Sequence, residues 1–171
     1  LFTGTDIPES VIPRITASLR REMENLVLIG MPGCGKSAVA EALGKALGRE
    51  VLDTDAYIEE HTGYTPEQII TMQGESVFRT HESEAVRELG SAFGAIVATG
   101  GGAPLHQNGV IFWLRRDLDK LERDGRPLSR AGNLNAMYEM REKRYLRFAD
   151  YIIDNNRALE DTVEDIRKVI L

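Results

Sequence analysis

Short apolar runs alternate along the chain with longer segments in which apolar side chains recur at helical spacing. The apolar runs predict strands at 26–29, 50–52, 95–98, 110–114 and 151–153. Helical spacing predicts helices at 37–47, 75–89, 134–148 and 159–170. Short, wholly apolar strands between helices are typical of a parallel sheet covered on both faces. The pattern therefore predicts an α/β fold, in which ligands bind beyond the carboxyl ends of the strands.

The helix predicted at 37–47 shows how the pattern assigns an inward face. Gly48 is expected to end this helix. The residues expected to face the sheet are Val39, Ala42, Leu43 and Ala46.

Residues 1–25 stand apart from the alternation of strands and helices. Ile15, Leu19 and Met23 recur at four-residue spacing among charged residues, and Pro8 and Pro13 each suit a first helical turn. We predict one or two short amphipathic helices. A surface helix docked on the domain is the favoured interpretation, because amphipathic helices mostly pack. The tail of an upstream domain, or a helix that binds a partner, is the alternative.

Composition and charge narrow the class of protein. The chain has 171 residues, 42% hydrophobic and 28% charged, which suits one globular domain with a short extension. The formal net charge is −6, so the chain lacks the excess of basic residues that is typical of proteins that bind nucleic acid or an anionic membrane. No apolar run reaches the roughly 20 residues that span a bilayer. The single cysteine, Cys34, forms no internal disulfide, and we expect a cytoplasmic protein.

The stretch GMPGCGKS at 30–37 matches G-x-x-x-x-G-K-[ST], and it lies between a predicted strand and a predicted helix. Backbone N–H groups of such a loop surround phosphate oxygens, and the dipole of the next helix favours the same anion. Lys36 is expected to reach the β- and γ-phosphates, and the Ser37 hydroxyl to bind Mg²⁺. We take Cys34 as a structural loop residue and not a nucleophile.

Two carboxylates follow the predicted strand at 50–52. In an extended segment, Asp53 and Asp55 would point to the same side, beside the phosphate loop. One can hold Mg²⁺ while the other accepts a hydroxyl proton in phosphoryl transfer. Asp55 is an equally good N-cap for a helix that follows, so both roles stay open. The strand at 95–98 runs into three glycines without a terminal acid, which leaves Asp53 as the natural magnesium ligand.

Four arginines downstream are candidates for binding anions. Arg79 lies one turn into a predicted helix, Arg123 and Arg126 flank a glycine turn, and Arg141 precedes Tyr145 by four residues. Arginines over a phosphate site stabilise the charge that is transferred. Each arginine taken alone is more typical of a solvated surface.

Several short motifs together resemble the shikimate kinase family: GMPGCGKS, DTD, GESVFR, ATGGG, DGRPL and R-x-x-x-Y followed by Ala-Asp. The resemblance covers residues 26–171. It implies a three-layer α/β/α P-loop kinase with a five-stranded parallel sheet in the order 2-3-1-4-5 and a moving lid. It also implies transfer of the γ-phosphoryl group of ATP, with Mg²⁺, to the 3-hydroxyl of shikimate, on the route to chorismate and the aromatic amino acids.

The resemblance also implies roles for individual residues. Asp55 would be the general base, Lys36 and Arg126 would act on the transferring phosphate, and Ser37 and Asp53 would hold Mg²⁺. The residues implied to bind shikimate are Asp55, Phe78, Arg79, Glu82, Gly101, Gly102 and Arg141. The residues implied to bind the nucleotide are Gly33, Cys34, Gly35, Lys36, Ser37, Ala38, Arg123, Arg126 and Arg157. The lid segment at 116–126 is short for the family, and no proline follows Arg157.

The sequence also leads to expectations about partners and about rival functions. We expect a monomer acting on a small molecule. Because the chain begins at Leu1 and residues 1–25 are not part of the usual family domain, a fusion to, or a contact with, another shikimate-pathway enzyme stays open. The rivals are a gluconate kinase of the same fold and a nucleotide-binding module without chemistry. Arg79 and Arg141 count against the first rival, and Asp55 and Arg126 count against the second.

Overall fold

The computed structural model describes residues 11–100, 109–122 and 134–170. Its strands form one sheet in the order β2-β3-β1-β4-β5, and every neighbouring pair is parallel. The strands are β1 (Asn25–Ile29), β2 (Val51–Asp53), β3 (Ile96–Ala98), β4 (Gly109–Arg115) and β5 (Tyr151–Asp154). Both the predicted α/β class and the predicted order 2-3-1-4-5 are confirmed.

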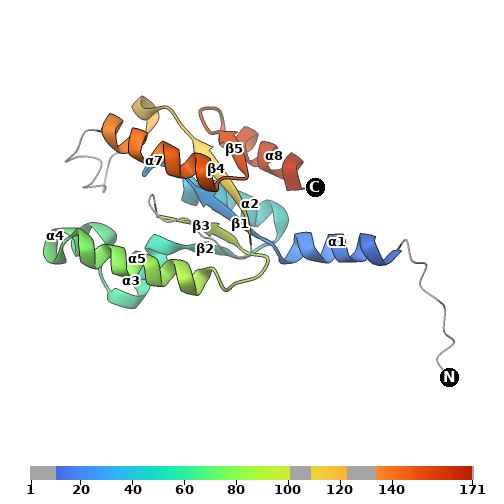
Figure 1. The fold of residues 1–171 in the computed structure, drawn as a ribbon, viewed down its shortest axis with the longest axis horizontal. Coiled ribbons are helices and arrows are strands. Elements are labelled where there is room, and N and C mark those ends of the chain that lie inside the picture. The colour runs from blue at the N-terminus through green and yellow to red at the C-terminus, as the bar shows by residue number, and fades with distance from the viewer. Residues whose placement is uncertain (1–10, 101–108, 123–133, 171) are drawn as a thin grey trace, which may run out of the picture.

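Helices cover both faces of this sheet (Figure 1). They are α1 (Val11–Met23), α2 (Lys36–Leu47), α3 (Thr54–Thr62), α4 (Pro66–Gln73), α5 (Glu75–Leu89), α7 (Leu134–Phe148) and α8 (Leu159–Ile170), with a 3₁₀ turn, η1 (Leu118–Lys120). In the part of the chain that the structure describes, no helix is long and apolar enough to cross a membrane.

The core lies around the central strands. Every residue of β1 is buried, and Phe112 and Leu114 of β4 are fully buried, as expected for strands covered on both faces. A smaller cluster joins α3, α4 and α5 through Ile58, Ile69 and Phe78. The two clusters fix the helices that carry candidate site residues to the carboxyl edge of the sheet.

The predicted inward face of α2 is wrong at Ala46, which is exposed. The buried stripe includes Val39, Leu43 and Gly44 instead. A Cβ on Gly44 would collide with the Val51 side chain, so α2 approaches the sheet most closely at this glycine. Because glycine has no side chain, it leaves no mark in a hydrophobic pattern.

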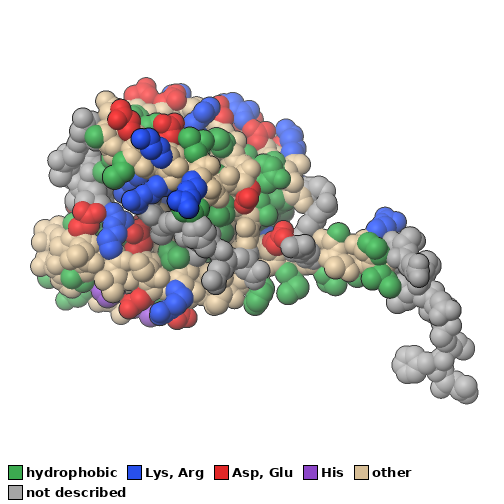
Figure 2. Space-filling model, in the orientation of Figure 1, with side chains coloured by type: hydrophobic (Ala, Val, Ile, Leu, Met, Phe, Trp, Pro, Cys, Tyr) green, Lys and Arg blue, Asp and Glu red, His purple; other side chains and the backbone are tan. Residues whose placement is uncertain are grey.

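Helix α1 projects away from the rest of the fold, and apolar side chains line it (Figures 1 and 2). Ile12, Ile15, Leu19 and Met23 are 55%, 49%, 52% and 51% exposed. The expectation of a helix docked on the domain is therefore wrong. Only one residue separates α1 from β1, so the connection is too short for α1 to turn back and pack on the domain. Residues 1–10, which include Pro8, lie outside the described residues.

Candidate active site

The phosphate loop connects β1 to α2 in a conformation that requires glycine. Gly33 and Gly35 have φ values of +79° and +94°, in the left-handed region that favours glycine. A Cβ on Gly33 would also collide with the backbone of Glu122, which donates its N–H to the Gly33 carbonyl at 3.1 Å. The loop is thus held from its outer side by the segment that follows β4.

Lys36 is folded into the loop that it follows. Its side-chain Nζ donates to the carbonyl oxygens of Gly30 at 3.1 Å and Met31 at 3.0 Å. It also lies 3.9 Å from the Sγ of Cys34, which is fully buried. The ammonium charge is thereby kept at the position where the motif predicts phosphate oxygens.

Asp53 joins the phosphate loop to the helix that carries Asp55. Its Oδ2 accepts from the Ser37 hydroxyl at 2.7 Å, and its Oδ1 accepts from the backbone N–H of Asp55 at 2.8 Å. Asp53 is therefore the N-cap of α3, and the alternative that Asp55 is the cap is wrong. The expected extended segment is also wrong, because the helix begins at Thr54.

The pair of Ser37 and Asp53 suits Mg²⁺ more than a transition metal. Both groups offer oxygen, and Mg²⁺ is usually held by one or two protein ligands with water completing its octahedron. Among the described residues no cluster of three or more His, Cys, Asp or Glu side chains offers a competing metal site.

Asp55, Glu82 and Gly100 converge at the carboxyl end of β3. The Oδ1 of Asp55 lies 3.4 Å from the point that a Cβ on Gly100 would occupy, and the Oε1 of Glu82 would collide with that Cβ. The Gly100 N–H donates to the hydroxyl of Thr54, which is fully buried, at 2.6 Å. The sequence does not single out Thr54, because a threonine between two aspartates carries no signal of burial.

Arg79 is bound on both sides by carboxylates. Its Nη1 donates to Glu82 Oε2 at 2.6 Å and its Nη2 to Glu75 Oε1 at 2.9 Å. Burial lowers the pKa of the Arg79 guanidinium, but Glu82 and Glu75 outweigh burial and the pKa is raised. The guanidinium carbon lies 5.4 Å from the ring centroid of Phe78. Arg79 is therefore ordered at the site, and the alternative of a solvated surface charge is wrong.

Arg141 lies inside the protein, with 6% of its surface exposed. Its Nη1 is buried and lacks a hydrogen-bond partner within the described ranges. Burial raises the pKa of the neighbouring Tyr145, and the positive charge of Arg141 acts in the opposite direction. The surface interpretation of Arg141 is wrong too. A buried guanidinium nitrogen with free donor capacity suits an anionic ligand.

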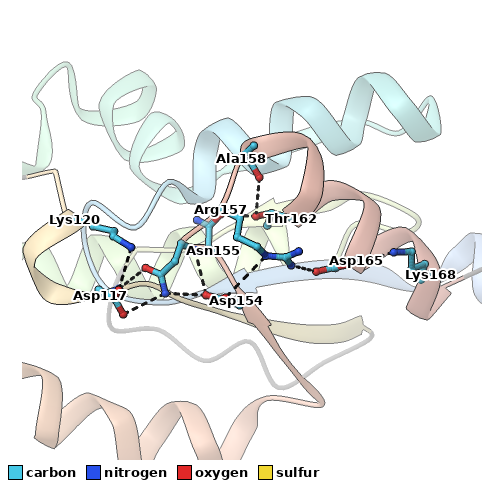
Figure 3. A network of polar contacts seen from close by, with 10 residues as sticks. Asp117, Lys120, Asp154, Asn155, Arg157, Ala158, Thr162, Asp165 and Lys168 are labelled. Carbon is cyan, nitrogen blue, oxygen red and sulfur yellow. Dashed lines mark hydrogen bonds and ion pairs between the residues drawn. The ribbon is translucent and has the colours of Figure 1, made fainter.

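The loop between β5 and α8 supports the phosphate loop from a distant part of the chain. Figure 3 shows the polar side chains of this loop and of α8. Asn155, 3% exposed, donates its Nδ2 to the carbonyl oxygen of Cys34 and accepts from the Thr162 hydroxyl at 2.8 Å. The sequence pattern singles out neither residue. Arg157, expected near the nucleotide, is exposed and ion-paired with Asp165. The ion pair raises the pKa of Arg157 and lowers that of Asp165.

The family model of shikimate kinase matches residues 32–171. The chain belongs to the shikimate kinase family. A shikimate kinase of Clostridium botulinum (strain Alaska E43) is 35% identical over 164 residues, which cover 87% of this chain and 99% of the relative. A relative from Clostridium beijerinckii is 36% identical over 160 residues, 85% of this chain and 94% of its own.

Solved structures agree with the family assignment. A shikimate kinase from Acinetobacter baumannii in complex with shikimate superposes with a TM-score of 0.81 and 32% identity, over 90% of this chain and 96% of the other. A gluconokinase from Sinorhizobium meliloti reaches a TM-score of 0.54 at 18% identity, over 88% of this chain and 93% of the other. The second likeness shows only a shared fold.

Family membership makes this protein a kinase that uses ATP and Mg²⁺. The described residues supply a phosphate loop, an oxygen pair for magnesium, and a group of carboxylates and arginines beside them. Four expected shikimate kinase site residues, Gly101, Gly102, Arg123 and Arg126, lie outside the described residues. Residues 123–126 of the expected lid segment also lie there, whereas residues 116–122 are described.

Proposed function

We propose that this shikimate kinase transfers the γ-phosphoryl group of ATP to the 3-hydroxyl of shikimate through a donor half at the phosphate loop and an acceptor half on α3, α5 and α7. The observation that carries the proposal is the double role of Asp53. One carboxylate accepts from Ser37 of the phosphate loop at 2.7 Å and from the N–H of Asp55 at 2.8 Å. It thus links the two halves in one polar network.

In the donor half, Lys36 exchanges its backbone acceptors for phosphate oxygens. The carbonyls of Gly30 and Met31 that now accept from Nζ are neutral, whereas phosphate oxygens are charged and form stronger hydrogen bonds with an ammonium group. Ser37 and Asp53 would hold Mg²⁺, which neutralises charge on the β- and γ-phosphates when bound.

In the acceptor half, Asp55 accepts the proton of the attacking hydroxyl. Arg79 and Arg141 bind the substrate carboxylate, for which the planar guanidinium is well matched. Glu82 is the positioning residue that orients Arg79. Gly101 and Gly102 offer backbone to the substrate, and Arg126 contacts the transferring phosphate.

The test is Asp55→Asn, compared with Glu59→Gln, an exposed carboxylate on the same helix. We expect Asp55→Asn to lower kcat by about 10²–10⁴-fold, the range for general acid–base catalysis. Binding of ADP, measured by titration calorimetry, should stay unchanged in both variants. Unchanged turnover in Asp55→Asn would refute the base role.

The acceptor itself is tested with the wild-type protein. ADP release should require shikimate and should not be supported by gluconate or by nucleoside monophosphates. Turnover with gluconate in place of shikimate would contradict the proposal and favour the rival kinase.

We further propose that residues 26–171 form the kinase domain and that residues 1–25 are an appendage, except that Asn25 is buried as the first residue of β1. We also propose that the enzyme acts as a cytoplasmic monomer. The exposed apolar side chains of α1 support an appendage outside the domain core. A contact with, or a fusion to, another enzyme of the pathway would use this stripe.

A further inference from the structure

Arg116, the residue directly after β4, lies against the phosphate loop. Its Nη1 is 3.5 Å from the point that a Cβ on Gly35 would occupy, and Asn155 Nδ2 is 3.4 Å from the same point. Gly35 immediately precedes Lys36 and Ser37, whose backbone N–H groups open α2. The guanidinium of Arg116 therefore stands next to the part of the loop where a phosphate binds.

Arg116 forms no ion pair with the described residues. Its Nε is buried and lacks a hydrogen-bond partner among them, and none of their ion pairs includes Arg116. Two nearby carboxylates are engaged elsewhere (Figure 3). Asp117 bonds to Lys120 at 3.2 Å, and Asp154 accepts from Asn156 at 2.8 Å.

Arg116 also lines a cavity of about 410 Å³ at the carboxyl ends of β4 and β5. The residues that border the cavity are Arg115, Arg116, Asp117, Leu118, Tyr138, Asp154 and Asn156. Its volume is in the range typical of small-molecule sites. A half-buried arginine with an unpartnered, buried Nε, which lines a cavity and lies against the phosphate loop, is suited to an anionic ligand.

We propose that Arg116 is a nucleotide ligand that contacts the phosphate chain of ATP or ADP beside Gly35 of the phosphate loop. Arg116 is carried by the end of a core strand, so the strand fixes its position before the nucleotide binds. The resemblance to the family implied a phosphate contact for Arg126 and adenine contacts for Arg123 and Arg157, and it gave Arg116 no role.

The test compares Arg116→Ala with Arg115→Ala, because the two adjacent arginines line the same cavity but only Arg116 lies against Gly35. Titration calorimetry measures the Kd of ADP and of adenosine, and steady-state kinetics measures KM for shikimate. Loss of a charge-assisted hydrogen bond predicts a Kd for ADP about tenfold higher in Arg116→Ala. The Kd of adenosine and KM for shikimate should stay within about twofold, as should every value in Arg115→Ala.

Three results would overturn the proposal: an unchanged Kd for ADP in Arg116→Ala, an equal loss in Arg115→Ala, or an equal loss of adenosine binding. An equal loss in Arg115→Ala would indicate only the general positive potential at the end of the strand. An equal loss of adenosine binding would indicate that Arg116 contacts the nucleoside. Arg116→Gln keeps the length of the side chain and removes its charge, and it gives the same test if the alanine variant does not fold. Shikimate-dependent turnover in the wild type tests the enzyme's activity separately.

Discussion

At the scale of single residues, Glu82 connects two parts of the acceptor half. It is 4% exposed, and its Oε2 accepts from Arg79 at 2.6 Å while its Oε1 faces Gly100. A buried carboxylate is costly without a charged partner, so Glu82 and Arg79 depend on each other. Gly100 has no room for a side chain beside Glu82. The position of Glu82 is therefore fixed by its contact with Gly100 as well as by its ion pair with Arg79.

Removing Glu82 should affect substrate binding more than removing the other carboxylate that bonds to Arg79. We expect Glu82→Ala to raise KM for shikimate about tenfold or more, because Arg79 loses its buried partner and its fixed orientation. Glu75 is exposed, so Glu75→Ala should change KM by about twofold or less. Steady-state kinetics at saturating ATP measures both. Equal effects would show that Glu82 does not position Arg79.

At the scale of elements, the loop from β5 to α8 holds the phosphate loop through one buried side chain. Asn155 bonds to Cys34, 121 positions earlier, and to Thr162 at 2.8 Å. Asn156 beside it joins Asp117 and Asp154 at the surface. Asn155 and Asn156 therefore lie in the same loop, but the Asn155 side chain is more buried than that of Asn156.

Replacement of Asn155 should destabilise the fold and weaken nucleotide binding together. Asn155→Ala leaves the Cys34 carbonyl without its buried donor and the Thr162 hydroxyl with only the Ala158 carbonyl at 3.5 Å. We expect this to cost about 1–3 kcal/mol in the free energy of unfolding. The Kd of ADP should rise in parallel, because the loop loses a support. Asn156→Ala is the matched control, with a change of about 0.5 kcal/mol or less expected from chemical denaturation. A full loss of stability without any change in Kd would contradict the link.

The sequence predicted what depends on local pattern and missed what depends on distant contacts. Apolar runs and helical spacing gave every strand and most helix bounds within a few residues, because burial dictates those patterns. Asp55 was weighed as the cap where Asp53 is the cap, since both side chains can cap and the two possible starts of α3 differ by only two residues. Asn155 and Arg116 were missed, because their importance comes from the phosphate loop, which lies far away in sequence.

At the scale of the whole molecule, α1 and the domain are expected to behave independently. An amphipathic pattern is the same whether a helix packs or projects, so the sequence did not settle this. Ile15→Ser combined with Leu19→Ser should change the free energy of unfolding by about 0.5 kcal/mol or less, because both side chains are exposed. Leu43→Ala, in the core, should cost about 2–5 kcal/mol. Kinetics of the double variant should match the wild type.

Thermal or urea unfolding measures both changes in this comparison. A loss above about 1 kcal/mol in the double variant would mean that α1 packs on the domain in solution, as the sequence first suggested.

The chain contains a single tryptophan, Trp113, and the fold has put it where it can report on the acceptor half. Its ring lies 5.5 Å from that of Tyr145, which precedes β5 in the same α7 helix as Arg141. At 2% exposure, Trp113 should emit at the blue wavelengths typical of a water-free environment. An anion that draws Arg141 toward itself changes the field at this aromatic pair, so intrinsic emission offers a label-free signal for acceptor binding.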